Sequence, residues 1–348
     1  MMMKKIILLC VLVLAGCAPL AQESDETLTI GLLATLSGPA AVHGTHVVIG
    51  AEKAVEELNA EGADIKLIVE DNKNQPKEGI SGYHRISLEQ PDVIFTTMSG
   101  ASATLLPLAQ EDGIPVVTSL TYADFRKYDN VYQYFQTTED LTSLAANFFT
   151  EKGISRVGLL STNIEAGHAL MDIAREKFKD EGLEIVGEEF YAADSVEHRT
   201  QILKLADKGP EAIYVFDLRP DKVAKQIKER YDGVVVFSDT PVSTNLFKTI
   251  DDLDGVYAAA QLYMIEGTEE NEQFQSLFGD VDGNAEAGMG YDVIHLIWEA
   301  HQKGELPESV DALETFTGLS GEIDLRESRK PSIPIKMVLI KDKTLVLV

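Results

Sequence analysis

Apolar residues recur along the chain at two spacings, one typical of buried strands and one typical of amphipathic helices. Residues 29–34 alternate and then run apolar as a buried strand does, residues 37–39 interrupt the run, and from Val47 the apolar positions recur at helical spacing. This stretch predicts a strand, a tight glycine loop and a helix. Backbone N–H groups at the start of such a helix favour an anion such as a carboxylate, although an ordinary turn of a doubly wound sheet has the same pattern.

The same alternation continues to the C-terminus. In the first part of the chain it predicts further strands and helices at residues 64–71, 76–89, 93–97, 99–112 and 114–118. The segment 132–140 is predicted to be a short extended piece followed by a helix-capping signature. The alternation of helices and strands restarts after it, with elements at 141–151, 156–161, 166–181, 184–191, 197–208, 212–216, 221–230 and 234–237. The last are predicted at 256–260, 270–278, 285–303, 318–324, 335–341 and 344–348, the final two as a hairpin. Strands that alternate with helices predict parallel sheets with right-handed crossovers.

The N-terminal residues have the pattern of a processing signal. Two lysines precede an apolar run over residues 6–14, which is too short to span a bilayer as a mature helix. The sequence Leu14-Ala15-Gly16-Cys17 follows and resembles the lipobox of bacterial lipoproteins, in which cleavage before the cysteine leaves it diacylated. We therefore expect a lipoprotein signal peptide at 1–16, lipidation at Cys17 and a polar tether at 17–26. An ordinary secretory signal cleaved nearby is the alternative.

Composition and charge narrow the possible functions. The chain has 348 residues, of which 45% are hydrophobic, enough for two compact domains. Lys and Arg number 30 against 57 Asp and Glu, so the formal charge of -27 makes nucleic acid and anionic membrane surfaces poor partners. The two cysteines lie at positions 10 and 17, and Cys10 would leave with the signal peptide, so the folded body is expected to contain no disulfide. No later segment approaches the length of a transmembrane helix, so Cys17 would be the only membrane anchor.

An ordered set of short motifs connects the chain to a known family. The motifs are Ser37-Gly38-Pro39-Ala40 with Gly44, residues 50–59, Val69-Glu70-Asp71 with Pro76, Ser99-Gly100 before Pro107, residues 113–116, Tyr291-Asp292, and residues 318–321. With these motifs the chain resembles the type I periplasmic binding proteins of ABC importers, specifically the branched-chain amino acid (Leu/Ile/Val) binding family. The resemblance covers nearly all of the mature chain. It implies an α/β fold of two doubly wound parallel-sheet lobes with ligand between them, where open parallel sheets bind ligands.

The resemblance also implies the domain boundaries. Lobe one is expected at 27–138 plus 254–322 and lobe two at 139–253 plus 323–348. Three hinge crossovers would then lie near Gln136, Asp254 and Asp324. Hinge bending would bury the ligand and present a new surface to a permease.

The same resemblance assigns ligand-binding residues. In such proteins a serine at a helix start and a small-x-Thr element after the next strand hold an amino-acid carboxylate, and these positions are here Ser99, beside Gly100, and Ser119-Leu120-Thr121. Hydroxyl and N–H donors at two strand ends can share one carboxylate, although Ser99 acting only as an N-cap is the simpler interpretation. Asp239 falls near the family's acidic partner for an ammonium group, where a solvated loop aspartate is the alternative.

Three departures from the family bear on specificity. His43 stands where the family often has an aromatic ring, Ala166 where it often has tyrosine, and Asp217-Leu218-Arg219 replaces another aromatic segment. Losing rings should change the accepted side chain, so leucine-type specificity does not carry over. If Arg219 faces the cleft, it could pair with a second carboxylate on an acidic ligand; an exposed arginine at a helix start is the alternative.

Other chemistry lacks support in the sequence. His43 and His46 have no evident third metal ligand, and the motifs of hydrolases and nucleotide-binding proteins are missing. Tyr291, His295 and Trp298 lie at helical spacing and predict packing, with Tyr291 the one that could line the cleft. We therefore expect no enzyme activity, no cofactor and no metal.

Two functions of different classes remain. The first is a lipid-anchored extracytoplasmic substrate-binding protein, periplasmic or on the cell surface, that delivers an amino acid or related carboxylate to an ABC permease. The second is a sensory or regulatory lipoprotein of the same fold that acts through a protein partner.

Overall fold

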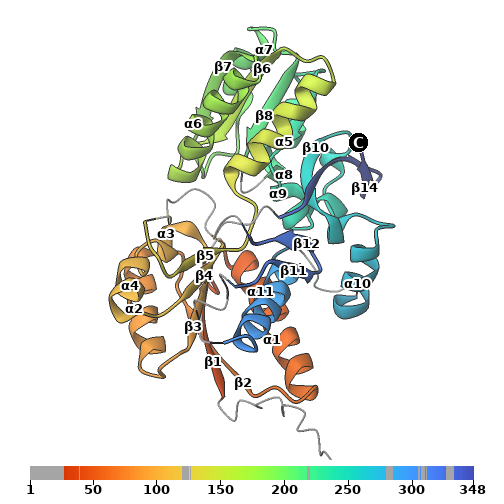
Figure 1. Ribbon diagram of the computed structural model, residues 1–348. Coiled ribbons are helices and arrows are strands. Elements are labelled where there is room, and N and C mark those ends of the chain that lie inside the picture. The colour runs from red at the N-terminus through yellow and green to blue at the C-terminus, as the bar shows by residue number, and fades with distance from the viewer. Residues whose placement is uncertain are drawn as a thin grey trace, which may run out of the picture.

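The computed structural model describes residues 27–38, 40–119, 125, 127–217, 220–279, 285–304, 306, 310, 312–326 and 333–348. These residues form two α/β lobes, each built on its own sheet (Figure 1). In this part of the chain, no helix is both long enough and apolar enough to cross a bilayer.

The smaller sheet has five strands in the order β2-β1-β3-β4-β5, and every neighbouring pair is parallel. The strands are β1 (Leu28–Ala34), β2 (Ile65–Asp71), β3 (Val93–Thr96), β4 (Val116–Thr118) and β5 (Val131–Gln133). The helices beside them are α1 (Ala41–Ala60), α2 (Pro76–Ser87), α3 (Ser99–Ser102), α4 (Leu106–Asp112) and α11 (Ala285–His301). Successive strand residues point to opposite faces, so Ile30 and Leu32 pack against α1 and α11, whereas Leu33 packs against α2 and α4.

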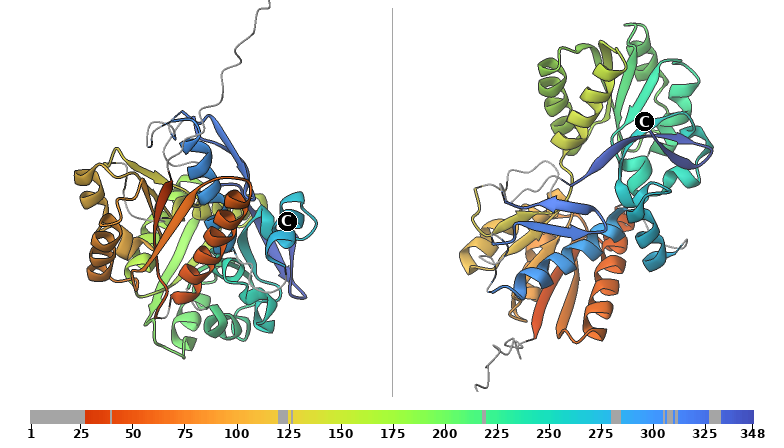
Figure 2. Two further views of the ribbon diagram at one scale, coloured as in Figure 1. Left: turned by 90° about the horizontal axis from the view of Figure 1, so that it is seen from below. Right: turned by 45° about the vertical axis from the view of Figure 1, so that its right-hand side comes forward.

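Helices α1 and α11 are far apart in the sequence and lie side by side (Figure 2). Two glycines allow their close approach. A Cβ atom on Gly50 would lie 1.9 Å from the carbonyl oxygen of Ala287, and one on Gly290 would lie 2.2 Å from that of Val47. No side chain fits in either place, so the two backbones are in contact there. This contact attaches α11 to the smaller lobe and brings the N-terminal turns of both helices to the same edge of the sheet.

The larger sheet has the order β14-β13-β10-β9-β8-β6-β7. Its strands are β6 (Arg156–Thr162), β7 (Glu184–Tyr191), β8 (Ala212–Phe216), β9 (Val234–Phe237), β10 (Tyr257–Gln261), β13 (Ile335–Lys341) and β14 (Thr344–Leu347). Helices α5 (Thr138–Glu151) and α6 (Glu165–Asp180) cover one face, and α7 (Arg199–Ala206) and α8 (Pro220–Lys228) cover the other. The other helices in this part of the chain are α9 (Thr240–Ser243), α10 (Glu269–Phe278), η1 (Leu246–Lys248), η2 (Asp251–Leu253) and η3 (Leu262–Met264).

The terminal hairpin and the capping signature before α5 agree with the sequence prediction, although α5 begins at Thr138 rather than at the predicted residue 141. Asp342 and Lys343 both have positive φ angles, +50° and +63°, as a type I′ hairpin turn requires. Thr137 and Asp140 form a capping box at the start of α5. Because β13 pairs with β10 and β14 in antiparallel fashion, the larger sheet is mixed rather than wholly parallel.

Many elements begin or end a few residues from their predicted bounds, and three predictions differ from the structure in kind. The single helix expected at 99–112 is two helices, because Pro107 in the first turn of α4 lacks the N–H that a continuous helix would need. The strand expected at 318–324 is a hairpin of β11 (Thr315–Gly318) and β12 (Gly321–Asp324). The lobe boundary expected at residue 254 is wrong because β10 pairs with β9 and β13, so the chain leaves the larger sheet only after Gln261.

A buried aspartate joins segments that run between the lobes. Asp292 on α11 accepts hydrogen bonds from the backbone N–H groups of Leu319 and Ser320, at 2.7 and 2.9 Å, and from the Ser320 hydroxyl at 2.7 Å. It also accepts one from the Tyr134 hydroxyl at 3.0 Å, in the connection between β5 and α5. Burial raises the pKa of Asp292, and these donors oppose that rise. The carboxylate thus fixes both the β11–β12 turn and the first connection to α11.

Candidate ligand-binding site

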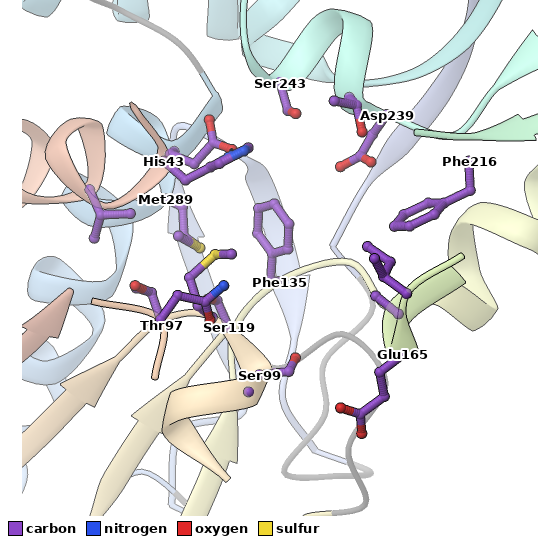
Figure 3. A pocket seen from close by; sticks show the side chains of 18 of the residues that line it. His43, Thr97, Ser99, Ser119, Phe135, Glu165, Phe216, Asp239, Ser243 and Met289 are labelled. Carbon is purple, nitrogen blue, oxygen red and sulfur yellow. The ribbon is translucent and has the colours of Figure 1, made fainter. Parts of the chain in front are cut away.

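A cavity of about 490 Å³ lies between the two lobes (Figure 3). Its lining comes from α1, α11, and the ends of β3 and β4 in the smaller lobe, and from α6 and the ends of β8 and β9 in the larger lobe. The lining residues are His43, Val47, Asn74, Pro76, Thr97, Met98, Ser99, Gly100, Ser119, Phe135, Ile164, Glu165, Ala166, Phe216, Asp239, Thr240, Ser243, Glu286 and Met289. The cavity is therefore at the carboxyl ends of parallel strands, where the topology of such sheets leaves a crevice.

The cavity brings together most of the residues predicted to bind a ligand. Those on its lining are His43, Ser99, Gly100, Ser119 and Asp239. Thr121, Arg219 and Cys17 lie outside the described residues.

The wall formed by the smaller lobe carries hydroxyl groups. Ser99 is the first residue of α3 and Met98 occupies the N-cap position, so the interpretation of Ser99 as an N-cap is wrong. Ser119 follows β4 directly and is almost completely buried. The Thr97 hydroxyl is buried and has no hydrogen-bond partner among the described residues, which makes it available to a ligand.

The backbone of this wall is held in place from behind. The carbonyl oxygen of Thr97 accepts hydrogen bonds from the Asn72 side-chain amide, at 3.1 Å, and from the Ser102 hydroxyl, at 2.8 Å. Met98 has a φ angle of +68°, a conformation that a residue with a side chain rarely adopts. Such strain persists only where neighbouring contacts impose it, and it recurs at binding sites. Here it turns the chain sharply between β3 and α3 and sets the directions of Thr97 and Ser99.

Three titratable side chains gather at another part of the cavity (Figure 3). His43 Nδ1 lies 2.6 Å from Glu286 Oε1, and Asp239 accepts a hydrogen bond from the Gln136 side chain at 3.0 Å. Burial disfavours the protonated form of His43, but the Glu286 carboxylate outweighs burial and raises the pKa of His43 above its usual value. Burial, together with the nearby Glu286, raises the pKa of Asp239, against the effect of Gln136. A cation placed among these groups would relieve the repulsion between the two carboxylates.

Aromatic rings line the cavity, although not at the positions the family comparison considered. Phe135, in the connection after β5, and Phe216, the last residue of β8, both point into the cavity (Figure 3). The site therefore has aromatic rings of its own in addition to the departures noted at His43 and Ala166. Asp217 is buried within the larger lobe, where it accepts a hydrogen bond of 2.7 Å from the Tyr191 hydroxyl. Ala166 lines the cavity and leaves it open where a larger side chain would intrude.

Glu286 is the main site residue that the sequence analysis missed. It is 6% exposed and lies in the first turn of α11, in the otherwise small and apolar run 285–290. One acidic residue in a buried apolar helix face was the available signal. Tyr291, by contrast, lies outside the lining and donates a hydrogen bond of 3.0 Å to Glu57 on α1, which agrees with the packing role predicted for it.

The sequence and the fold of this chain were compared with those of known proteins, and both comparisons found similar proteins. A profile described as "Periplasmic binding protein" matches residues 27–337. The chain is 25% identical over 248 residues to the Leu/Ile/Val-binding protein BraC3 of Rhizobium johnstonii, a match that covers 67% of this chain and 66% of that protein. It is 21% identical over 220 residues to the Leu/Ile/Val-binding protein of Escherichia coli, covering 60% of each. These matches thus span less than two thirds of the relatives' lengths.

Two solved structures show the same fold over almost their full length. A branched-chain amino acid transporter substrate-binding protein, LivJ, from Streptococcus pneumoniae in complex with isoleucine has a TM-score of 0.79 at 20% identity, with 93% of this chain and 99% of that chain covered. A solute-binding protein of an ABC transporter from R. palustris in complex with benzoate has a TM-score of 0.81 at 19% identity, with 93% and 96% covered. At these identities the likeness establishes the fold.

Proposed function

The chain belongs to the periplasmic binding protein family, and from that premise we propose that it captures an amino acid or related small carboxylate between its lobes and delivers it to an ABC permease. One observation carries the proposal. A single cavity, lined by both lobes, has hydroxyl groups on one wall and a carboxylate on another. These are the complementary groups that the two ends of an amino acid require. The relatives and solved structures named above are binding proteins and not enzymes.

The hydroxyl-bearing wall is the proposed carboxylate subsite. Thr97, Ser99 and Ser119 come from two adjacent strand ends, and Gly100 adds a backbone at which a ligand meets no side chain. Hydroxyl donors form shorter and stronger hydrogen bonds to an ionised acceptor than to a neutral one. Because Thr97 has no hydrogen-bond partner among the described residues, binding a carboxylate there would satisfy a buried group.

Asp239 is the proposed partner of the ligand's ammonium group. It lies between β9 and α9 in the larger lobe, so a ligand bound to both Asp239 and the hydroxyl-bearing wall would connect the two lobes. Gln136, which donates to Asp239, lies in the connection after β5. Ligand binding and the relative position of the lobes are therefore coupled through the same residues, as hinge closure requires.

A thermal-shift and calorimetry panel tests the proposal. The purified protein is screened against amino acids, dicarboxylates, amides, short peptides and benzoates, and hits are repeated with Ser99→Ala and Ser119→Ala. A ligand at a hundred times its dissociation constant should add about 2.7 kcal/mol to the apparent stability. We expect an amino acid to bind. Each serine variant should weaken its binding by about tenfold to a hundredfold, because one charge-assisted hydrogen bond is worth about 1.5–3 kcal/mol.

The panel also separates the alternatives. Binding of benzoates alone would assign an aromatic carboxylate as the solute and remove the role proposed for Asp239. If no compound shifts the melting temperature of a well-folded protein, the solute-binding proposal fails. The sensory or regulatory lipoprotein acting through a protein partner then becomes the better interpretation.

We further propose that Cys17 carries a lipid that holds the protein at the outer face of the cytoplasmic membrane or at the cell surface. The support is the sequence Leu14-Ala15-Gly16-Cys17 behind a short apolar run. Two acyl chains on one residue give a stable anchor, whereas a single chain does not. Cys17→Ser should therefore move the protein from the membrane fraction to the soluble extracytoplasmic fraction, as followed by fractionation and immunoblotting. Unchanged partitioning would contradict lipidation at this residue.

A further inference from the structure

A buried histidine–glutamate pair in the cavity has no part in the function proposed above. His43 on α1 and Glu286 on α11 meet at 2.6 Å, and their side chains are only 17% and 8% exposed. Val47 and Met289, on the same two helices, form an apolar wall beside them. Burying a charged pair seldom adds stability over apolar residues of similar size. Titratable groups in such clefts are instead typical of functional sites.

The geometry of the pair determines what it offers to a ligand. Glu286 binds Nδ1 of the ring and so fixes the orientation of the imidazole, which leaves Nε2 as the nitrogen available in the cavity. The groups that face His43 are Glu286 from α11 and Asp239 from the larger lobe, and both favour its protonated form. While His43 is protonated, Nε2–H is a donor held in a fixed direction. An aliphatic side chain placed against that N–H would remove its solvation without replacing its hydrogen bond.

The charges around the pair limit what the ligand side chain can carry. When both carboxylates are ionised and His43 is protonated, Glu286 and Asp239 contribute two negative charges and His43 one positive charge, which gives the cluster a net charge of minus one. Under the proposed function, the ligand's ammonium group cancels that charge. A further charge on the ligand side chain would be left uncompensated beside the apolar wall. Glu165 is exposed at the edge of the cavity and points away from the cluster (Figure 3).

We propose that the ligand is an amino acid, or an analogue of one, whose side chain carries a neutral hydrogen-bonding group, an amide or a hydroxyl, that bonds to His43. This rests on the proposed function and specifies its substrate class. A site built to hydrogen-bond a polar side chain rejects an aliphatic one strongly, because its own buried group is then left unpaired. Aliphatic amino acids are therefore poor ligands here.

Matched pairs of amino acids test this proposal by calorimetry at pH 6.5. Asparagine is compared with leucine and threonine with valine, since each pair has nearly the same shape and differs in hydrogen bonding. Of asparagine and threonine, the one that binds more tightly should have at least tenfold higher affinity than the aliphatic amino acid of its pair. His43→Phe should reduce that ratio to threefold or less. His46→Phe, on the same helix but outside the cavity lining, is the control and should leave the ratio unchanged.

A pH series separates a specific role of His43 from simple loss of shape. In the wild-type protein the preference for the polar ligand should decline as the pH rises and the His43 ring loses its proton. Glu286→Gln keeps the size of the side chain but removes its charge, so the decline should start at a lower pH. A preference that is independent of pH in both proteins would overturn the role of His43.

The remaining outcomes distinguish the two proposals. If leucine or valine binds as tightly as its polar match, the substrate class is wrong while solute binding stands. If only amino acids with charged side chains bind, the substrate class is likewise wrong. If no amino acid binds, the proposed function itself fails and the substrate class fails with it.

Discussion

Asp239→Ala is expected to weaken amino-acid binding about a hundredfold. In the proposed complex the carboxylate faces the ligand's ammonium group inside a cavity shared by both lobes. Truncating one member of a desolvated, hydrogen-bonded charge pair costs about 2–5 kcal/mol, because the other charge stays buried without its partner. A loss of about 2.7 kcal/mol corresponds to a hundredfold change in affinity at 25 °C. Calorimetric titration of the best ligand measures the change directly.

The stability of the unliganded protein distinguishes a binding role from a structural one. Burial and the neighbouring Glu286 raise the pKa of Asp239, so its ionised form is disfavoured before a ligand arrives. Removing the carboxylate should therefore leave the melting temperature of the free protein unchanged or slightly higher. Asp239→Asn keeps an acceptor for Gln136 and should lose nearly as much affinity as the alanine variant.

The exposed Asp232 supplies the matched control for this lobe, since Asp232→Ala should change neither affinity nor stability. Acidification provides a second check. Because the pKa of Asp239 is raised, ligand affinity should begin to fall at a higher pH than an ordinary aspartate would give. An affinity for Asp239→Ala within threefold of wild type would contradict the role of this carboxylate.

Much of the fold could be predicted from the sequence because its strands are short apolar runs bounded by turns. β1 is buried on both faces, and its run of apolar residues is visible without knowing what packs on it. The family resemblance is confirmed by the profile match, and the α/β fold with it. The place of β10 was not predictable in the same way. Its alanine-rich sequence would suit either sheet, and only its pairing with β9 and β13 assigns it to the larger lobe.

In the candidate site, too, local sequence patterns predicted some residues, whereas others are brought together only by contacts between distant parts of the chain. Ser99, Ser119 and Asp239 lie at strand ends, which the topology of parallel sheets identifies in advance. Glu286 lies 243 residues after His43, and nothing local connects them. Their meeting depends on the backbone contact between α1 and α11 at Gly50 and Gly290, a property of tertiary packing. Sequence patterns therefore located the proposed carboxylate subsite better than the end of the cavity proposed to determine specificity.

The second large effect is a loss of stability expected from changing Asp292. This residue has no proposed contact with the ligand, but it binds segments that connect the two lobes. Asp292→Ala removes the acceptor of four hydrogen bonds, two of them from the backbone N–H groups of Leu319 and Ser320. Those N–H groups are held in position by the β11–β12 turn, and the variant removes the acceptor that both of them have in the native protein. Each buried donor left unsatisfied costs about 1–3 kcal/mol. The variant should lose about 3–5 kcal/mol of stability and melt about 10 °C lower.

Thermal unfolding, monitored by circular dichroism, measures this loss of stability. Tyr134→Phe and Asp324→Ala serve as a partial variant and a control. Tyr134→Phe removes one of the four donors and should cost about 1 kcal/mol. Asp324, which is exposed and paired with Arg326, should tolerate alanine with almost no change in melting temperature. The raised pKa of Asp292 shows that its burial is itself unfavourable. If that penalty outweighed the hydrogen bonds, Asp292→Ala would melt at or above the wild-type temperature. That result would contradict the role of the Asp292 carboxylate in holding the β11–β12 turn and the first connection against α11.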